Sequence, residues 1–251
     1  MPHIDLNCDL GESFGAYTIG MDEKVIPFIT SANVACGFHA GDPLVMQRTV
    51  ALCKQSSAAV GAHPGFPDLQ GFGRRQMKLT PAEAMACVQY QIGALKAFCD
   101  AAGVPLHHVK PHGALYNMAG KDRALADAIC AAVKESAPGA VLLALSGSEM
   151  VKAAQAIGLP VANEMFADRG YRPDGSLVPR GTPGAMIEDE DEAIARVIRM
   201  VTEGKVTAND GTDIAIQADS VCVHGDGPKA LAFVEKIGAA LQAAGVELKA
   251  F

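Results

Sequence analysis

Short apolar runs alternate along the chain with longer segments whose apolar residues recur at helical spacing. The runs predict seven strands, at residues 4–8, 29–36, 58–62, 106–110, 141–145, 160–164 and 220–223. Helices are predicted between and after them, at residues 42–55, 80–103, 124–135, 149–157, 188–204 and 228–244. Such alternation is typical of parallel βαβ units, which build either an open sheet or a closed barrel. No break in composition divides the sequence, so we expect a single domain over residues 1–251.

Two of the predicted helices begin with strong capping signals. Asp42 precedes Pro43, and this pair suits an N-cap followed by a proline in the first turn. Thr80 and Glu83 form a capping box that has Pro81 at the first helical position. We therefore expect both helices to begin at these residues.

The first predicted strand carries polar residues on one face and apolar residues on the other. Because successive strand side chains point to opposite faces, Asp5, Asn7 and Asp9 share a face. A solvent-exposed edge strand alternates in the same way, but here the acids gather where the strand ends, and Glu12 follows. We expect Asp5 to be buried deepest and to be structural. Asn7, Asp9 and Glu12 are expected to lie nearer a site.

The other predicted strands also end in polar residues. These residues are Asn33, Cys36 and His39, then His63, then His108, Lys110 and His112, then Glu164, Asp168 and Arg169, and finally His224 and Asp226. In open α/β sheets and in barrels alike, binding sites form at the carboxyl ends of the strands. One histidine in such a position is most often structural, but five of the seven histidines lie there. This clustering indicates an active site.

Two kinds of chemistry fit these residues. A Zn or Mn ion could be held by side chains from separate strands. The candidate metal ligands are Asp9, His39, His63, His112 and His224. No local signature such as HExxH supports a metal. Without a metal, Asp9 or Glu12 could act as general base. Lys110, His112 or Arg169 would then stabilise an oxyanion.

Two further segments could bind an anion. Arg74 and Arg75 follow a glycine-rich turn and could grip a carboxylate or phosphate, although a surface loop with two solvated arginines fits equally well. The residues Ser146-Gly147-Ser148 could present backbone N–H groups to an anion, or could simply cap a helix. A Walker A sequence, a GxGxxG turn after a strand and a Gly-x-Ser-x-Gly elbow are all absent. The chain therefore gives no sign of binding a nucleotide by itself.

Composition excludes several classes of protein. The chain has 251 residues, of which 49% are hydrophobic, so a sizeable core can form. Its net charge of -7 argues against a nucleic-acid-binding surface. The seven cysteines are odd in number and lack a CxxC pair, which is typical of free thiols in a reducing compartment. No signal peptide and no run of ~20 apolar residues is present, so we expect a cytoplasmic protein without membrane spans.

Several segments resemble the LamB/YcsF family. The matching segments are Asp5-Leu-Asn-Cys-Asp-Leu-Gly-Glu12, Asn33-Val-Ala-Cys-Gly-Phe-His-Ala-Gly-Asp42, Gly61-Ala-His-Pro-Gly65, Gly71-Phe-Gly-Arg-Arg75, Val109-Lys-Pro-His-Gly-Ala-Leu-Tyr-Asn117, Glu164-Met-Phe-Ala-Asp-Arg-Gly-Tyr171 and Val223-His-Gly-Asp226. They span nearly the whole chain and occur in the family's order. The resemblance implies a seven-stranded parallel β/α barrel of the glycoside hydrolase/deacetylase type.

The resemblance also implies an activity. The family is described as the A subunit of the bacterial ATP-dependent 5-oxoprolinase, which opens the lactam ring of 5-oxo-L-proline (pyroglutamate) to give L-glutamate. This description implies ATP with its Mg ion as a further reactant, and 5-oxoprolinase subunits B and C as partners. The missing P-loop agrees with ATP being handled mainly with those partners.

On this hypothesis the candidate residues receive roles. The catalytic residues are Asp9, Glu12, Lys110 and His112. The substrate-binding residues are Asn7, Asn33, His39, His63, Arg74, Arg75, Glu164, Arg169 and His224. An acid from the first strand would position the attacking water, while Lys110 and His112 would polarise the lactam carbonyl. One of the three arginines would bind the substrate carboxylate or a phosphate.

Two other functions fit the sequence. A stand-alone metal-dependent deacetylase of an N-acetylated carbohydrate suits the barrel type and the Asp and His residues. A non-catalytic subunit that only binds oxoproline needs the cations, but it has little use for Asp9 and Glu12 beside them. Metal content and ATP-independent release of acetate would identify the deacetylase. Hydrolysis of a chemically activated substrate by this chain alone would exclude the purely binding role.

Overall fold

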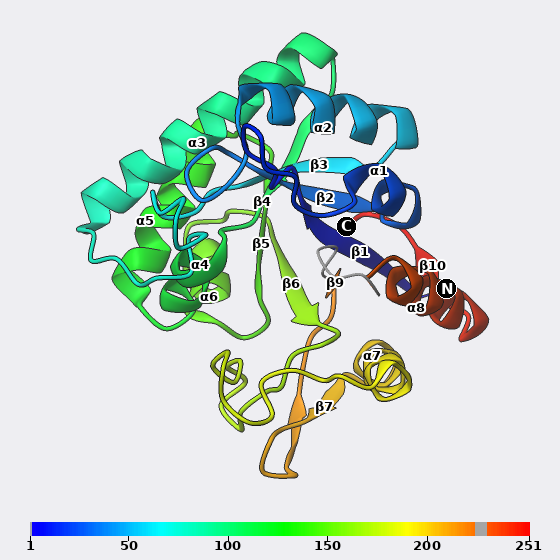
Figure 1. Cartoon of the computed structure of the whole chain (residues 1–251). Helices are drawn as coiled ribbons and strands as arrows, with labels where there is room; N and C mark the ends of the chain where they lie inside the picture. The colour runs from blue at the N-terminus through cyan, green and yellow to red at the C-terminus, as the bar shows by residue number, and fades with distance from the viewer. Residues whose placement is uncertain (1, 224–229) are drawn as a thin grey trace.

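A closed barrel of seven parallel strands forms the centre of the molecule (Figure 1). The computed structural model describes residues 2–223 and 230–251. The barrel strands are β1 His3–Leu10, β2 Ser31–Ala35, β3 Ala59–His63, β4 Leu106–Val109, β5 Val141–Leu145, β6 Val161–Phe166 and β9 Ser220–Val223. They follow this order around the barrel, and β1 closes it by pairing with both β2 and β9. The apolar pattern also allowed an open sheet, and this double pairing of β1 confirms the barrel.

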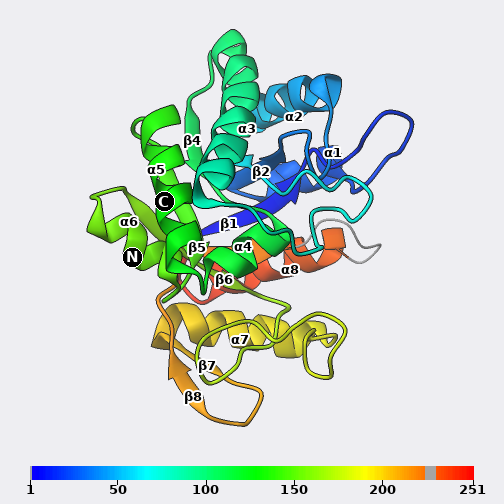
Figure 2. The same cartoon turned by 90° about the vertical axis from the view of Figure 1, so that its left-hand side faces the viewer.

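Helices cover the outside of the barrel (Figure 1 and Figure 2). They are α1 Asp22–Val25, the 3₁₀ helix η1 Ile26–Phe28, α2 Pro43–Ser56, α3 Pro81–Ala102, α4 Gly113–Ala119, α5 Arg123–Ser136, α6 Glu149–Ala156, α7 Glu190–Glu203 and α8 Ala230–Ala243. Both capping signals are confirmed. The Asp42 side chain accepts a hydrogen bond from the Val45 N–H at 2.9 Å, and Thr80 with Glu83 forms the capping box of α3. In the described ranges, no helix is both long enough and apolar enough to cross a membrane.

Several short elements did not follow from the apolar pattern. Strands β7 Lys205–Thr207 and β8 Asp213–Ala215 pair antiparallel outside the barrel, beside α7 (Figure 2). Strand β10 Glu247–Leu248 pairs with the start of β1. Segments of two or three residues bury too few side chains to leave a period in the sequence. Helix α4 was also missed, and it places Tyr116 at the mouth of the barrel.

The inside of the barrel is polar because each strand turns alternate side chains inward. On β1, Leu6 and Cys8 belong to the apolar core, whereas Asp5 and Asn7 are fully buried polar residues. Asp5 accepts hydrogen bonds from three hydroxyl groups, those of Thr30, Ser31 and Ser220. Burial raises the pKa of Asp5 in spite of these bonds. Asp5 therefore organises the floor of the barrel, as expected of a structural residue.

A second polar layer lies above this floor. Asn33 donates to the Asn7 side-chain oxygen at 2.8 Å, and its own oxygen lies 2.8 Å from His108 Nε2. Burial lowers the pKa of His108 well below its usual value, so the ring is neutral and donates this hydrogen bond. The ring needs room, and Gly61 on the adjacent strand β3 provides it. A Cβ atom at Gly61 would lie 2.1 Å from His108 Nε2.

Gly61→Ala is expected to lower the free energy of unfolding by about 3 kcal/mol, because the added methyl group overlaps the His108 ring. The matched control is Gly93→Ala on α3, where a Cβ atom meets nothing within 4 Å. The control is expected to raise stability by roughly 0.5–1 kcal/mol through helix propensity. Urea denaturation measures both variants. Equal stability of Gly61→Ala and the wild type would contradict this packing.

Candidate functional site

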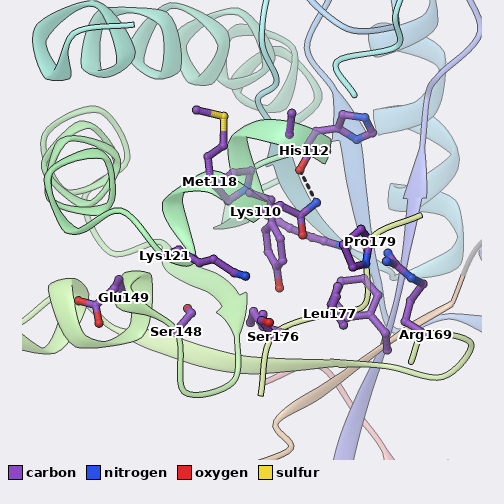
Figure 3. Close-up of a pocket in the computed structure, with 18 of the residues that line it drawn as sticks. Lys110, His112, Met118, Lys121, Ser148, Glu149, Arg169, Ser176, Leu177 and Pro179 are labelled. Carbon is purple, nitrogen blue, oxygen red and sulfur yellow. Dashed lines mark hydrogen bonds between the residues drawn. The ribbon is translucent and has the colours of Figure 1, made fainter. Parts of the chain in front are cut away.

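A cavity of about 830 Å³ opens at the carboxyl ends of the barrel strands (Figure 3). The candidate residues that line it are Asp9, Glu12, His63, Arg74, Lys110, His112 and Arg169. Helix α4, the start of α6 and residues 174–180 complete the wall. The structure therefore brings together strand-end residues that lie far apart in the sequence, at the end of the barrel where α/β enzymes carry their sites.

Other candidates lie beneath or beside the cavity. Asn7, Asn33 and Glu164 are fully buried in the layer below it. The His39 ring lies against the His112 ring, with the two centroids 3.7 Å apart and the planes nearly parallel. These four residues support the cavity wall and do not line it. His224 lies outside the described residues.

The three candidate arginines have different surroundings. Arg75 has a side chain that is 65% exposed and pairs with Asp68, so it does not face the cavity. Arg169 is buried and donates to the carbonyl groups of two loop residues, Val178 and Ala185. Burial lowers its pKa to about 10, which still leaves it charged at neutral pH. Arg74 lines the cavity, with its guanidinium 5.0 Å from the Phe72 ring centroid. Arg74 is thus the arginine best placed to meet a ligand.

Lys110 is the centre of a buried charge network. Its Nζ lies 2.7 Å from Glu164 Oε1 and 2.9 Å from Asp9 Oδ1. The Asn7 side-chain oxygen and the Cys222 sulfur each lie 3.2 Å away. Only 3% of the Lys110 side chain is exposed, so these groups replace its hydration shell. One cation is therefore shared by two carboxylates, which come from β1 and β6, the strands on either side of β9.

The network keeps its members charged. Burial alone would lower the pKa of Lys110, but Asp9, Cys222 and Glu164 raise it well above its usual value. Burial likewise opposes ionisation of Asp9, but His63 and Lys110 hold the pKa of that carboxyl well below its usual range. A charged Lys110 and an ionised Asp9 are therefore both expected at neutral pH.

Tyr116 is a functional candidate that sequence reasoning missed. Its hydroxyl donates to Glu164 Oε2 at 2.6 Å, so Glu164 is held between this hydroxyl and the Lys110 ammonium. Burial and the adjacent Glu164 raise the pKa of Tyr116 well above its usual value, which keeps the phenol protonated. The residue lies six positions after Lys110, within a segment that matches the family. That segment was the available signal, but nothing in it showed that α4 turns Tyr116 toward the barrel.

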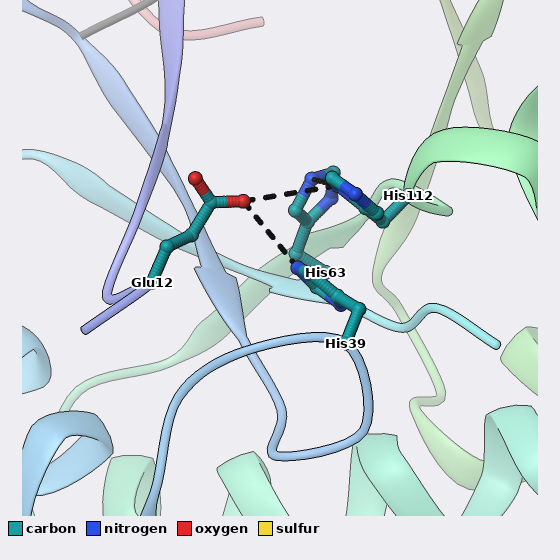
Figure 4. Close-up of side chains that lie close together, drawn as sticks. All are labelled: Glu12, His39, His63 and His112. Carbon is teal, nitrogen blue, oxygen red and sulfur yellow. Dashed lines mark hydrogen bonds and ion pairs between the residues drawn. The ribbon is translucent and has the colours of Figure 1, made fainter. Parts of the chain in front are cut away.

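Three histidine rings and a carboxylate meet beside Asp9 (Figure 4). His63 Nδ1 lies 2.7 Å from the Lys110 carbonyl oxygen, and His112 Nε2 lies 2.9 Å from the Phe72 carbonyl oxygen. A carbonyl accepts only, so both of these nitrogens carry hydrogen. If both rings are neutral, His63 Nε2 and His112 Nδ1 carry lone pairs, and these face each other at 2.9 Å. Two facing lone pairs repel unless one nitrogen is protonated and donates to the other, or both nitrogens bind the same metal cation.

Acidic oxygens surround the same point. Asp9 Oδ2 lies 3.3 Å from His63 Nε2, and Glu12 Oε1 lies 3.8 Å from His112 Nδ1. Glu12 Oε1 is also 3.4 Å from His39 Nε2. One ligand atom from each of Glu12, His39, His63 and His112 lies within 4.8 Å of the others, so this cluster could hold a metal ion. Ring N–H groups bonded to backbone carbonyls are the usual outer partners of metal-bound histidines.

Burial leaves two of the three rings without a charge. Burial lowers the pKa of His112 to about 3 and that of His39 well below its usual value. Neither ring is therefore protonated at neutral pH, and their lone pairs are available. His39 Nδ1 is buried and has no hydrogen-bond partner in residues 2–223 or 230–251. The arrangement combines neutral nitrogen donors, two carboxylates and one fixed ammonium ion. It can bind a cation, orient a water molecule and accept a proton.

Comparisons with known proteins agree with this picture. The sequence profile of the LamB/YcsF family matches residues 4–251. The chain is 63% identical over 248 residues to the A subunit of 5-oxoprolinase from Clostridium beijerinckii, covering 99% of this chain and 97% of the relative. It is 57% identical over 250 residues to the protein of the same name from Bacillus subtilis, covering 100% of this chain and 97% of that protein. The crystal structure of a lactam utilization protein from Thermus thermophilus superposes with a TM-score of 0.94 at 51% identity, covering 99% of this chain and 100% of that one.

Proposed function

The chain belongs to the LamB/YcsF family, and on this basis we propose that it opens the lactam ring of 5-oxo-L-proline as the A subunit of a 5-oxoprolinase. The observation that supports this most is the mouth of the barrel, where Asp9, Lys110 and the histidine cluster meet in one cavity. The names of close full-length relatives point to the same activity. A scaffold protein would have no need for an ion pair and neutral imidazoles at this end of the barrel.

We propose that ring opening is coupled to ATP. A lactam is as stable as an ordinary amide, and its carbonyl carbon is a poor electrophile. Transfer of the γ-phosphoryl group from ATP to the carbonyl oxygen releases ADP and activates the ring carbon. Water then adds to this carbon, and the C–N bond breaks as the ring nitrogen takes a proton. A second water hydrolyses the resulting acyl phosphate to L-glutamate and phosphate.

We propose a separate task for each of these residues, and the contacts of each one support it. His63 and Lys110 hold Asp9 ionised, and the carboxylate lines the cavity, where it would accept a proton from water. Arg74 is placed to bind the substrate carboxylate. His112 donates through Nε2 to a backbone carbonyl, so toward the cavity it can only accept.

We propose Zn or Mn as the ion of the cluster formed by Glu12, His39, His63 and His112. A set of imidazole nitrogens with one carboxylate suits zinc best. When bound, the ion supplies Lewis acidity toward the lactam oxygen or a bound water. The Lys110 and Phe72 carbonyl groups fix the tautomers that such binding requires.

Subunits B and C are the proposed partners, and ATP with its Mg ion is expected to be handled together with them. The compartment is proposed to be the cytoplasm. The seven cysteines are all free thiols, and six of them are buried, which suits a reducing environment.

The activity is tested by following glutamate formed from 5-oxo-L-proline, with and without ATP, by this chain alone and with subunits B and C. Glutamate is expected only with ATP. Asp9→Asn is expected to lower turnover by at least ~100-fold, as for loss of a general base. The control Asp127→Asn removes an exposed acid that pairs with Arg123 on α5, and it should be active. ATP-independent turnover, or normal turnover of a folded Asp9→Asn variant, would refute the proposal.

The metal-binding geometry favours one alternative, a metal-dependent deacetylase of an N-acetylated carbohydrate. A deacetylase would contain a bound metal and would release acetate from an N-acetylated sugar without ATP. Acetate release at rates comparable to glutamate formation would make this the better assignment.

A further inference from the structure

The cavity extends well beyond the space that one small lactam needs. His112 marks one pole, and Ser148 in the turn between β5 and α6 marks the other (Figure 3). Asp9 and His63 lie at the pole of His112. Its volume of about 830 Å³ is in the upper part of the ~300–1,000 Å³ range of ligand pockets. The far pole is lined by Ser146, Gly147, Ser148, Glu149, Lys121 and Lys152. None of these residues has a task in the lactam chemistry above.

The turn at the far pole is rigid. The Ser146 N–H donates to the Glu164 carbonyl at 3.0 Å, and the Ser148 N–H donates to the Leu145 carbonyl at 3.0 Å. Gly147 adopts φ +74°, a conformation that a residue with a side chain rarely takes. The first-turn N–H groups of the eight-residue helix α6 follow directly on this turn. The Glu149 N–H is already taken by the Gly120 carbonyl at 3.0 Å, so the start of α6 contributes the positive end of its helix dipole to this pole.

Ser148 is the unusual residue of this turn. It occupies the N-cap position of α6, yet its hydroxyl makes no capping hydrogen bond. The residue is only 7% exposed, and within the described part of the chain Oγ has no hydrogen-bond partner. A buried hydroxyl without a partner costs roughly 1–3 kcal/mol. Since Ser148 lines the cavity and its hydroxyl points toward Lys121 in Figure 3, the missing partner is best supplied by a ligand.

Lys121 supplies a cation at the same pole. Its side chain is exposed and extends over the cavity from the segment after α4 (Figure 3). Lys152 is close by, but its ammonium is engaged by Glu149 at 2.7 Å. The far pole thus combines a helix start, a hydroxyl donor and an ammonium ion, and these groups suit a multiply charged oxyanion.

We propose that Ser148, Lys121 and the start of α6 form a phosphate-binding subsite in this chain. The subsite rests on the proposed function for its place in the reaction, where the phosphate belongs either to a nucleoside triphosphate or to the phosphorylated lactam. A phosphate group has several acceptor oxygens for these separate donors, whereas a single carboxylate would leave one of them unused. The lactam carboxylate is left to Arg74 at the other pole.

The test measures binding to the isolated chain by calorimetry, with three probes: a non-hydrolysable ATP analogue with Mg, ADP with Mg, and inorganic phosphate. Lys121→Gln is expected to weaken binding by about tenfold or more, as for loss of a charge-assisted hydrogen bond. Ser148→Ala is expected to weaken it by about threefold to tenfold. Lys96→Gln is the control, because Lys96 pairs with Asp100 on α3 and does not line the cavity.

The stability of Ser148→Ala separates a ligand role from a structural one. Removing a hydroxyl that has no partner should leave the unfolding midpoint unchanged or raise it, while phosphate binding falls. If the ATP analogue binds tightly and inorganic phosphate displaces it, the subsite belongs to the nucleotide. Binding of phosphate without binding of the analogue assigns it to the phosphorylated lactam.

The proposal is overturned if the wild type binds none of the three probes, or if both variants bind them as Lys96→Gln does. A separate titration with 5-oxo-L-proline alone distinguishes failure of the subsite from failure of the proposed function. If the wild type binds phosphate but does not bind 5-oxo-L-proline, the result contradicts the proposed lactam activity and leaves the phosphate subsite standing. Lactam binding without phosphate binding counts against the subsite only.

Discussion

Lys110→Met is expected to slow ring opening severely and to lower the free energy of unfolding by about 3–5 kcal/mol. The substitution keeps the length and most of the volume of the side chain but leaves Asp9 and Glu164 facing each other without a cation. The pKa of Asp9 should then rise, because Lys110 is one of the groups that lower it. Without its ammonium partner Asp9 is less readily ionised and is no longer held in place to accept a proton from water, so turnover should fall by at least ~100-fold. Urea denaturation and glutamate formation in the reconstituted complex measure the two effects.

The double variant Lys110→Met/Glu164→Gln separates the two roles of the lysine. It removes one positive and one negative charge, so the buried network has the same net charge as in the wild type. Most of the lost stability is expected to return, because the Tyr116 hydroxyl can still donate to the amide oxygen that takes the place of Glu164 Oε2. Turnover is not expected to return, because Asp9 still lacks its cation. Recovery of both would show that Lys110 serves the fold alone.

The fold was largely predictable because it rests on burial. A barrel strand that is buried on both faces leaves an apolar run, and a helix on the barrel leaves its period, so the seven strands and the long helices followed from the pattern. Residues that act by backbone geometry leave no such period. The hairpin of β7 and β8 and helix α4 belong to this group.

For the candidate site, the sequence predicted which residues gather at the carboxyl ends of the strands, but it did not predict how deep each of them lies. The common direction of parallel strands brought Asp9, His63, Lys110 and His112 to one cavity, as expected. The depth of each residue could not be predicted, because it depends on the register between strands. Asn7 pairs in register with Ser31 on β2, below the mouth. The partner of Arg75 was likewise hidden, since Asp68 meets it only through the fold of the loop between them.

Purified protein is expected to contain about one zinc or manganese ion per chain, and His112→Gln is expected to lose nearly all of it. The substitution removes the bare Nδ1 that faces His63 Nε2 at 2.9 Å. Turnover should fall by about 100-fold if the ion polarises the substrate. Elemental analysis of the purified chain gives the metal content, and glutamate formation in the complex gives the activity.

His107→Gln is the matched control. His107 lies near the start of β4, away from the cavity, and its Nε2 contacts the Phe251 carbonyl oxygen. It should keep both the metal and the activity. Treating the wild type with a chelator should copy the defect of His112→Gln, and adding back the ion should restore turnover. Full activity of metal-free protein would contradict the assignment. The facing lone pairs of His63 and His112 would then require a shared proton, since two bare nitrogens at this separation cannot otherwise coexist.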